Sequence, residues 1–153
     1  MNITELVSTD CIALNVDVAS KKKALEYASE LLAQSHMDIV PAEIFDCLIS
    51  RERLGSTGVG KGIAIPHCRL QGNQETLVAM LRLQQGIDFD SIDGKPVDIL
   101  FAMVVPEDAG EAHLKALAQL ARMFSDESIL AQLHAATNAS EIYQILNQGV
   151  SAD

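Results

Sequence analysis

Cysteine is scarce in this sequence of 153 residues, and long hydrophobic runs are missing. The three cysteines, Cys11, Cys47 and Cys68, are odd in number and show no CxxC spacing, so the sequence predicts neither a disulfide framework nor a zinc site. The longest apolar run, residues 99–105, is far too short to span a bilayer, and the N-terminal segment does not have the pattern of a signal peptide. We therefore expect a cytoplasmic protein that is not inserted in a membrane.

The sequence also has few positively charged residues. Eleven lysines and arginines face 21 acidic residues, which gives a formal net charge of −10. This balance argues against a general nucleic-acid binder or a protein of anionic membrane surfaces, and it favours a partner with a basic face. With 48% hydrophobic residues, the chain has enough apolar material for one globular domain. We expect that domain to span residues 1–149 and residues 150–153 to form a loose tail.

Hydrophobic periodicity alternates between strand and helix patterns along the chain. Strands are predicted at 12–16, 63–65, 76–83 and 97–105, and helices at 3–7, 21–34, 41–53, 111–124, 126–134 and from 138 onward. The segment 97–105 is almost continuously apolar, which is typical of a central strand buried on both faces. The fold class expected is α/β: a single-domain sandwich with a mixed, parallel and antiparallel, central sheet and helices on both faces.

Residues 51–69 read RERLGSTGVGKGIAIPHCR and form the densest glycine cluster of the chain. Closely spaced glycines allow a pliable loop with positive φ angles, and Pro66 favours an extended backbone at Ile65. The segment therefore predicts a loop that feeds a short strand and holds His67 stiffly at its exit. Histidine is well suited to accept a proton or a phosphoryl group near neutral pH.

Two other interpretations of this segment are weaker. Residues 55–61 match the spacing of a nucleotide-binding P-loop, but Gly62 replaces the Ser or Thr that would hold magnesium, and the preceding pattern is helical rather than a strand. A catalytic pair of His67 and Cys68 is disfavoured because adjacent residues on an extended segment point to opposite faces. Cys68 is expected to be a packed or half-exposed residue.

Three side chains in the sequence are candidates for one anion site. Arg51 precedes the glycine loop, His67 follows it, and His113 begins the helix after the central strand. A helix N-terminus attracts anions and disfavours a cationic imidazole, so His113 is expected to be neutral and to act as a hydrogen-bond donor. Arginine supplies a planar charged fork for phosphate oxygens. The alternative is structural: Arg51 and Arg53 would then only stabilise the helix end.

Other charged residues of the chain are assigned no function. His36 is expected in a loop, and His134 is explained by stabilisation of a helix end. The cluster Lys21-Lys22-Lys23 is expected to be solvated surface.

The run from Arg51 to His67 resembles the signature of the enzyme IIA components of the bacterial phosphotransferase system. The similarity is to the mannitol/fructose-type family, most closely to its nitrogen-regulatory branch, and it extends over nearly the whole chain. The resemblance implies that His67 is phosphorylated on Nε2, that His113 supports it and that Arg51 stabilises the phosphoryl group. It also makes Ser56, Thr57 and Gly58 candidates for a phosphate-binding loop. Relatives often have glycine after the active histidine, where this chain has Cys68, a difference that affects the contact surface.

The function implied by this resemblance is a phosphoryl-carrier and regulatory protein. Its donor would be a small HPr-like (NPr-type) phosphocarrier, itself phosphorylated through an enzyme I that uses phosphoenolpyruvate. Its phosphorylation state would regulate partners such as a transporter or a sensor kinase, and no cofactor or metal is expected. The alternative within the family is a fructose- or mannitol-type component that passes the phosphoryl group to a permease IIB domain.

Two alternatives from other classes of protein remain. One is a binding regulator whose histidines are structural. The other is a metal-dependent hydrolase that uses His67 and His113, which is weak because the sequence has no HExxH spacing and no nearby carboxylate cluster.

Overall fold

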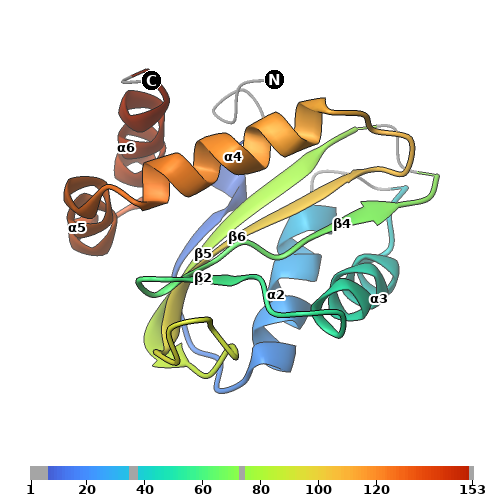
Figure 1. Cartoon of the computed structure of the whole chain (residues 1–153), viewed down its shortest axis with the longest axis horizontal. Coiled ribbons are helices and arrows are strands. Elements are labelled where there is room, and N and C mark those ends of the chain that lie inside the picture. Colours follow the sequence, from blue (N-terminus) through green and yellow to red (C-terminus); the bar gives the residue numbers. More distant parts are fainter. Residues whose placement is uncertain (1–6, 35–37, 73–74, 152–153) are drawn as a thin grey trace.

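The computed structural model describes residues 7–34, 38–72 and 75–151, and its centre is a six-stranded mixed sheet (Figure 1). The strands are β1 (Ile12–Val16), β2 (Gly58–Gly60), β3 (Ile63–Ala64), β4 (His67–Leu70), β5 (Leu77–Ile87) and β6 (Val97–Pro106). Residues 3–6 of the helical turn expected at 3–7 lie outside the described residues, and so does His36.

Strand β6 is the centre of this sheet, as its apolar sequence predicts. The strand order is β1-β5-β6-β3-β2, and β4 also pairs with β6. β6 runs antiparallel to β5 and parallel to β3 and β4, while β1 is parallel to β5. Along β6, alternate side chains enter two different hydrophobic clusters: Leu100, Ala102 and Val104 face one side, and Ile99, Phe101, Met103 and Val105 face the other. Both faces of the strand are therefore covered.

Helices cover the two faces of the sheet unequally (Figure 1). The first face carries α2 (Lys21–Ala33) and α3 (Pro41–Glu52), whose apolar sides join Leu100 in one cluster. The second face carries α4 (Ala112–Phe124), α5 (Glu127–Ala135) and α6 (Ala139–Ser151), and a short 3-10 helix, η1 (Thr9–Cys11), precedes β1. The α/β sandwich predicted from the sequence is confirmed.

Local sequence signals explain where several helices begin. The hydroxyl of Ser20 accepts a hydrogen bond from the backbone N–H of Lys23 at 3.2 Å, and Pro41 occupies the first turn of α3. The side chain of Asn138 accepts from the N–H of Glu141 at 2.9 Å, as the capping pattern predicts.

Three expectations about elements need correction. Residues 67–70 form a strand that the sequence pattern does not reveal, because β4 is short and is defined by its pairing with β6. Strand β5 continues to Ile87, four residues beyond the strand predicted at 76–83. Helix α6 runs to Ser151, so residues 150 and 151, which were expected to belong to a loose tail, are helical.

Cysteine pairing is a further correction. Cys47 on α3 and Cys68 on β4 form a disulfide, with their Cα atoms 5.9 Å apart. Sequence spacing misses this pair because the packing of α3 on β4 brings together residues that are 21 positions apart.

No helix within the described ranges combines the length and apolar character that a membrane crossing requires.

Candidate functional site

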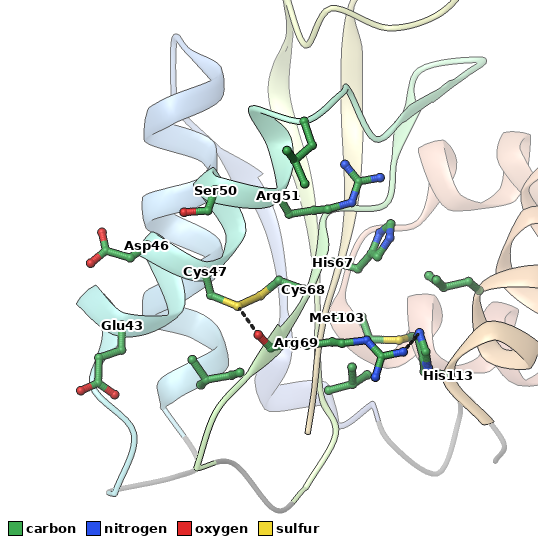
Figure 2. Close-up of a pocket in the computed structure, with 14 residues that line it drawn as sticks. Glu43, Asp46, Cys47, Ser50, Arg51, His67, Cys68, Arg69, Met103 and His113 are labelled. Atoms are coloured by element: carbon green, nitrogen blue, oxygen red, sulfur yellow. Dashed lines mark hydrogen bonds between the residues drawn. A yellow bond between two sulfur atoms is a disulfide. The ribbon is translucent and has the colours of Figure 1, made fainter. Parts of the chain in front are cut away.

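A cavity of about 650 Å³ opens between α3, β4, the second half of β6 and the start of α4. Arg51, His67 and His113 all line it, so the structure brings together the three residues that the sequence analysis grouped (Figure 2). Its walls also carry Arg69 and apolar side chains such as Met103. The cavity is thus a mixed surface in which cationic and imidazole groups converge on an apolar floor.

The backbone before His67 is fixed by strand pairing and by glycine conformations. Gly60 and Gly62 have φ angles of +95° and +81°, which L side chains rarely adopt, and they form the tight connection from β2 to β3. The carbonyl of Pro66 accepts from the N–H of Met103 at 2.9 Å, and His67 itself pairs with Met103 in the parallel β4–β6 ladder. The imidazole therefore projects from a rigid edge of the sheet.

The hydrogen bonding of His67 sets its tautomer. Its Nδ1 lies 2.7 Å from the carbonyl oxygen of Ile65. Because a carbonyl oxygen only accepts, Nδ1 carries the proton, and Nε2 is left with its lone pair. Burial lowers the pKa of His67 below 6.5, and the charge of Arg51 lowers this pKa further, against the opposing effects of the Ile65 carbonyl and the Glu52 carboxylate. The ring is therefore neutral and nucleophilic at neutral pH.

Arg51 combines a structural contact with a place in the cavity. Its Nη1 donates to the carbonyl oxygen of Gly55 at 2.9 Å, which ties the end of α3 to the glycine loop. The side chain also lines the cavity beside His67, where its charge acts on the imidazole. Arg53, the residue after α3, is exposed and does not line the cavity.

His113 is buried and both of its ring nitrogens have partners. Nδ1 donates to the carbonyl oxygen of Gly110 at 2.6 Å, and Nε2 accepts from Nη2 of Arg69 at 3.1 Å. The guanidinium can only donate, so His113 is in the neutral Nδ1–H form. Neutrality was expected, but the expected hydrogen-bond donation into the site is wrong for this arrangement, because Nε2 is an acceptor.

Arg69 is a site residue that the sequence analysis missed. Besides contacting His113, its Nη1 donates to the carbonyl oxygens of Glu107 at 3.1 Å and Ala109 at 2.6 Å, so it joins β4 to the loop before α4. One feature of the sequence could have indicated this residue. In an extended segment, residues two positions apart point to the same face, so Arg69 shares a face with His67.

The three candidates for a phosphate-binding loop do not line the cavity. The hydroxyl of Ser56 donates to the carbonyl oxygen of Phe89 at 2.7 Å and accepts from the N–H of Gly58 at 3.0 Å. A Cβ on Gly58 would lie 2.9 Å from Ser91, so glycine is needed there for close packing. Ser56 and Gly58 therefore anchor the glycine loop to the loop before β6 and are not part of the cavity around His67.

A buried carboxylate holds the base of the glycine loop. Glu52 accepts from the hydroxyl of Thr57 and from its backbone N–H at 3.3 Å, and it forms an ion pair with Lys21 at 2.8 Å. The ammonium group also lies 4.7 Å from the centre of the Phe89 ring. The prediction that all three lysines at the start of α2 are solvated surface is therefore wrong for Lys21, which is only 20% exposed.

Comparison with known proteins shows the family of this chain. Residues 5–149 match the family described as phosphoenolpyruvate-dependent sugar phosphotransferase system, EIIA 2. The chain belongs to the EIIA 2 family. It is 46% identical to a nitrogen regulatory protein of Pseudomonas aeruginosa over 133 residues, which cover 87% of this chain and 86% of that protein.

Two further proteins are similar to this EIIA 2 chain over nearly its whole length. The crystal structure of the nitrogen regulatory protein IIA-Ntr from Neisseria meningitidis superposes with a TM-score of 0.89 at 41% identity, over 94% of this chain and 98% of that chain. A fructose-specific EIIA component of Haloferax volcanii is 32% identical over 97% of both chains. The greater identity with nitrogen regulatory proteins confirms the branch expected from the sequence.

The disulfide of this EIIA 2 chain forms part of the cavity wall (Figure 2). Cys68 is directed toward α3 and His67 away from it, so the two side chains diverge as the extended backbone requires. In the described part of the chain, no cluster of three or more His, Cys, Asp and Glu side chains could hold a metal ion.

Proposed function

We propose that this chain accepts a phosphoryl group on Nε2 of His67 from a histidine-phosphorylated, HPr-like carrier protein. The observation that supports this most directly is the bond from Nδ1–H of His67 to the Ile65 carbonyl, at 2.7 Å. It leaves Nε2 as a free nucleophile on a half-buried ring in a cavity that also holds two arginines.

The chemistry follows from the tautomer. The Nε2 lone pair attacks phosphorus in line, the new N–P bond forms as the donor's N–P bond breaks, and the donor imidazole keeps that electron pair. His67 then carries positive charge on its ring, and the Ile65 carbonyl, which already accepts from Nδ1–H, stabilises it. Arg51 and Arg69 supply N–H donors and positive charge for the three equatorial oxygens. His113 holds the Arg69 guanidinium in position through its acceptor nitrogen.

Phosphorylation would also change what the surface recognises. A phosphoryl group brings roughly two negative charges into the cavity, where the unmodified protein presents two guanidinium groups and a neutral imidazole. We infer that partner proteins in the cytoplasm, such as a transporter or a sensor kinase, distinguish the two states at this surface. The similarity to nitrogen regulatory proteins supports a regulatory role.

A reconstituted relay tests this proposal. The full chain is incubated with enzyme I, an HPr-like carrier and phosphoenolpyruvate labelled on its phosphoryl group. We expect label on the wild-type chain and none on His67→Ala. His134→Ala is the matched control, because that ring contacts Asp98 at 2.9 Å, away from the cavity, and should leave labelling unchanged. Labelling of His67→Ala equal to wild type would refute the assignment.

The fructose-specific relative supports a second candidate, in which the phosphoryl group passes on to a permease IIB domain. Labelled protein mixed with a fructose- or mannitol-type IIB domain decides between them. Rapid transfer to IIB would favour the sugar-specific role. Retention of the label, together with capture of partners that depends on phosphorylation, would favour the regulatory role.

A further inference from the structure

We propose that Cys47 and Cys68 form a reversible thiol–disulfide site that controls phosphoryl acceptance at His67. This inference rests on the proposed function of His67, and it adds an oxidative modification to the same cavity. It starts from the pairing of two cysteines on separate elements, with Cα atoms 5.9 Å apart, well within the range that a disulfide bridges.

The disulfide connects the two elements that carry the reacting groups. Cys47 lies one helical turn before Arg51 on α3, so both side chains are on the same face of the helix. Cys68 is adjacent to His67 on β4. A covalent link between these cysteines therefore fixes the helix of the arginine against the strand of the nucleophile.

The position of Cys47 suits both redox states. Its Sγ lies 3.1 Å from the carbonyl oxygen of Arg69, a contact drawn in Figure 2. As a thiol, Cys47 can donate its S–H to that carbonyl; as a disulfide, it has no hydrogen to donate. Reduction thus exchanges a covalent bond to Cys68 for a hydrogen bond to Arg69. The Arg69 side chain also contacts His113, so a change at the Arg69 backbone can alter the position of groups on both sides of the cavity.

The two cysteines differ in exposure to solvent, which distinguishes their roles in thiol–disulfide exchange. Cys47 is half-buried and lines the cavity, so we expect a small thiol to approach it from solvent. Cys68 is only 8% exposed and packs in the core beneath α3. Cys47 is therefore the sulfur that exchanges with an external thiol, and Cys68 is the resolving partner. In the reducing compartment expected from the sequence, disulfides are usually transient and regulatory.

Glutathione disulfide is a sufficient oxidant, and the exchange balances. The Cys47 thiolate attacks one sulfur of glutathione disulfide, which forms a mixed disulfide and releases one glutathione thiolate. The Cys68 thiolate then attacks Cys47 Sγ, the protein disulfide forms and a second glutathione leaves. Two protein thiols are oxidised, one glutathione disulfide is reduced, and the two thiol protons pass to the glutathione thiolates.

The disulfide is expected to slow phosphoryl acceptance. In this structure, which has the disulfide, Arg51 donates to Gly55, and Arg69 donates to Glu107, Ala109 and His113. Arg51 must turn from the Gly55 carbonyl toward the phosphoryl oxygens, and a covalent link between α3 and β4 opposes any shift of α3 that this requires. We expect the reduced chain to be phosphorylated about fivefold faster, since small errors in alignment have large effects on transfer rates.

The experiment compares the oxidised and reduced forms of the full chain. The chain is equilibrated in glutathione buffers of graded ratio, and free thiols are identified by alkylation and peptide mass. Initial labelling rates are measured with purified phosphorylated carrier, without enzyme I. We expect Cys47 and Cys68 to be protected together in oxidising buffer and the labelling rate to fall with them. Cys47→Ser should label at the reduced rate in every buffer, and Cys68→Ser repeats the test from the buried side.

Matched controls make the outcomes separable. Cys11→Ala removes the remaining cysteine, which is buried and outside the disulfide, and it should keep the redox response of the wild-type chain. Failure of the pair to oxidise at any glutathione ratio would refute the site. A disulfide that forms with no change in labelling rate would refute the control of His67 but not its phosphorylation. Absence of label in both redox states would refute the proposed function itself, whatever the alkylation shows.

Discussion

The ion pair of Glu52 gives a sharp test of how the glycine loop is held. Glu52→Gln keeps the shape of the side chain but removes the charge that Lys21 contacts at 2.8 Å, where the two side chains are 20% and 2% exposed. The change also places an amide N–H₂ near donors, because both the hydroxyl and the backbone N–H of Thr57 donate to this carboxylate. The loop that leads to His67 therefore loses its buried anchor.

The magnitude follows from what Lys21 retains. Breaking a fully buried ion pair costs about 3–5 kcal/mol, because one charge is left without a partner. Lys21 is partly exposed and keeps Asp90 at 3.6 Å and the face of Phe89 at 4.7 Å, which reduces the loss. We expect the free energy of unfolding to fall by about 2–3 kcal/mol, which for a domain of this size lowers Tm by roughly 5–10 °C.

Urea unfolding of the wild-type and variant chains measures this loss. Glu26→Gln is the matched control, since Glu26 pairs with Lys23 at 3.4 Å in an exposed setting and should cost about 0.5 kcal/mol or less. A double-mutant cycle with Lys21→Met should give a coupling energy of about 1 kcal/mol or more. If Glu52→Gln costs no more than Glu26→Gln, the argument that this pair anchors the loop is wrong.

Three other predictions concern the site and the loop. Burial lowers the pKa of His67 below 6.5, so the unfolded chain binds this proton at higher pH than the native chain, and stability falls as pH drops through 6.5 toward the native pKa. His67→Gln should remove that part of the pH dependence in urea titrations, and equal slopes for both chains would contradict the shift. Arg69→Ala should slow labelling of His67 by roughly tenfold or more, because a charged donor is lost beside the phosphoryl group. Arg53→Ala changes an exposed residue that does not line the cavity, and it should leave the labelling rate unchanged. Equal slowing by both changes would argue against a specific role of Arg69 in phosphoryl transfer. Gly58→Ala would place a Cβ 2.9 Å from the facing loop and should cost about 1–3 kcal/mol in thermal unfolding, whereas Gly110→Ala, with open space around it, should be nearly neutral.

The fold was predictable where one strong pattern decides an element. The apolar run of β6 predicted the centre of the sheet, and the helices predicted to begin near residues 21, 41 and 138 begin there in the structure, with Ser20, Pro41 and Asn138 in their first turns or caps. β4 was not predictable in the same way. It has four residues, carries a histidine and an arginine, and exists as a strand because the edge of β6 pairs with it.

The site divides along similar lines. Arg51, His67 and His113 were grouped because helix ends and strand exits are local features that a sequence reveals, and the cavity contains all three. Ser56, Thr57 and Gly58 were grouped with them by motif, but their hydrogen bonds and packing connect them to Glu52, Phe89 and Ser91. The direction in which these side chains point depends on the segment packed against the glycine loop. That segment contains Phe89 and Ser91, some thirty residues further along the chain.

The α/β class, the order of most elements, the family and the histidine after a proline were all predictable from the amino-acid sequence, because each depends on local periodicity or on a contiguous motif. Four features are visible only in the folded chain: the tautomers of His67 and His113, the contacts of Arg69 with the loop before α4, the buried pair of Lys21 and Glu52, and the disulfide of Cys47 and Cys68. These features depend on contacts between segments distant in the chain. Such contacts are set by how helices and strands pack, and no spacing within one segment encodes them.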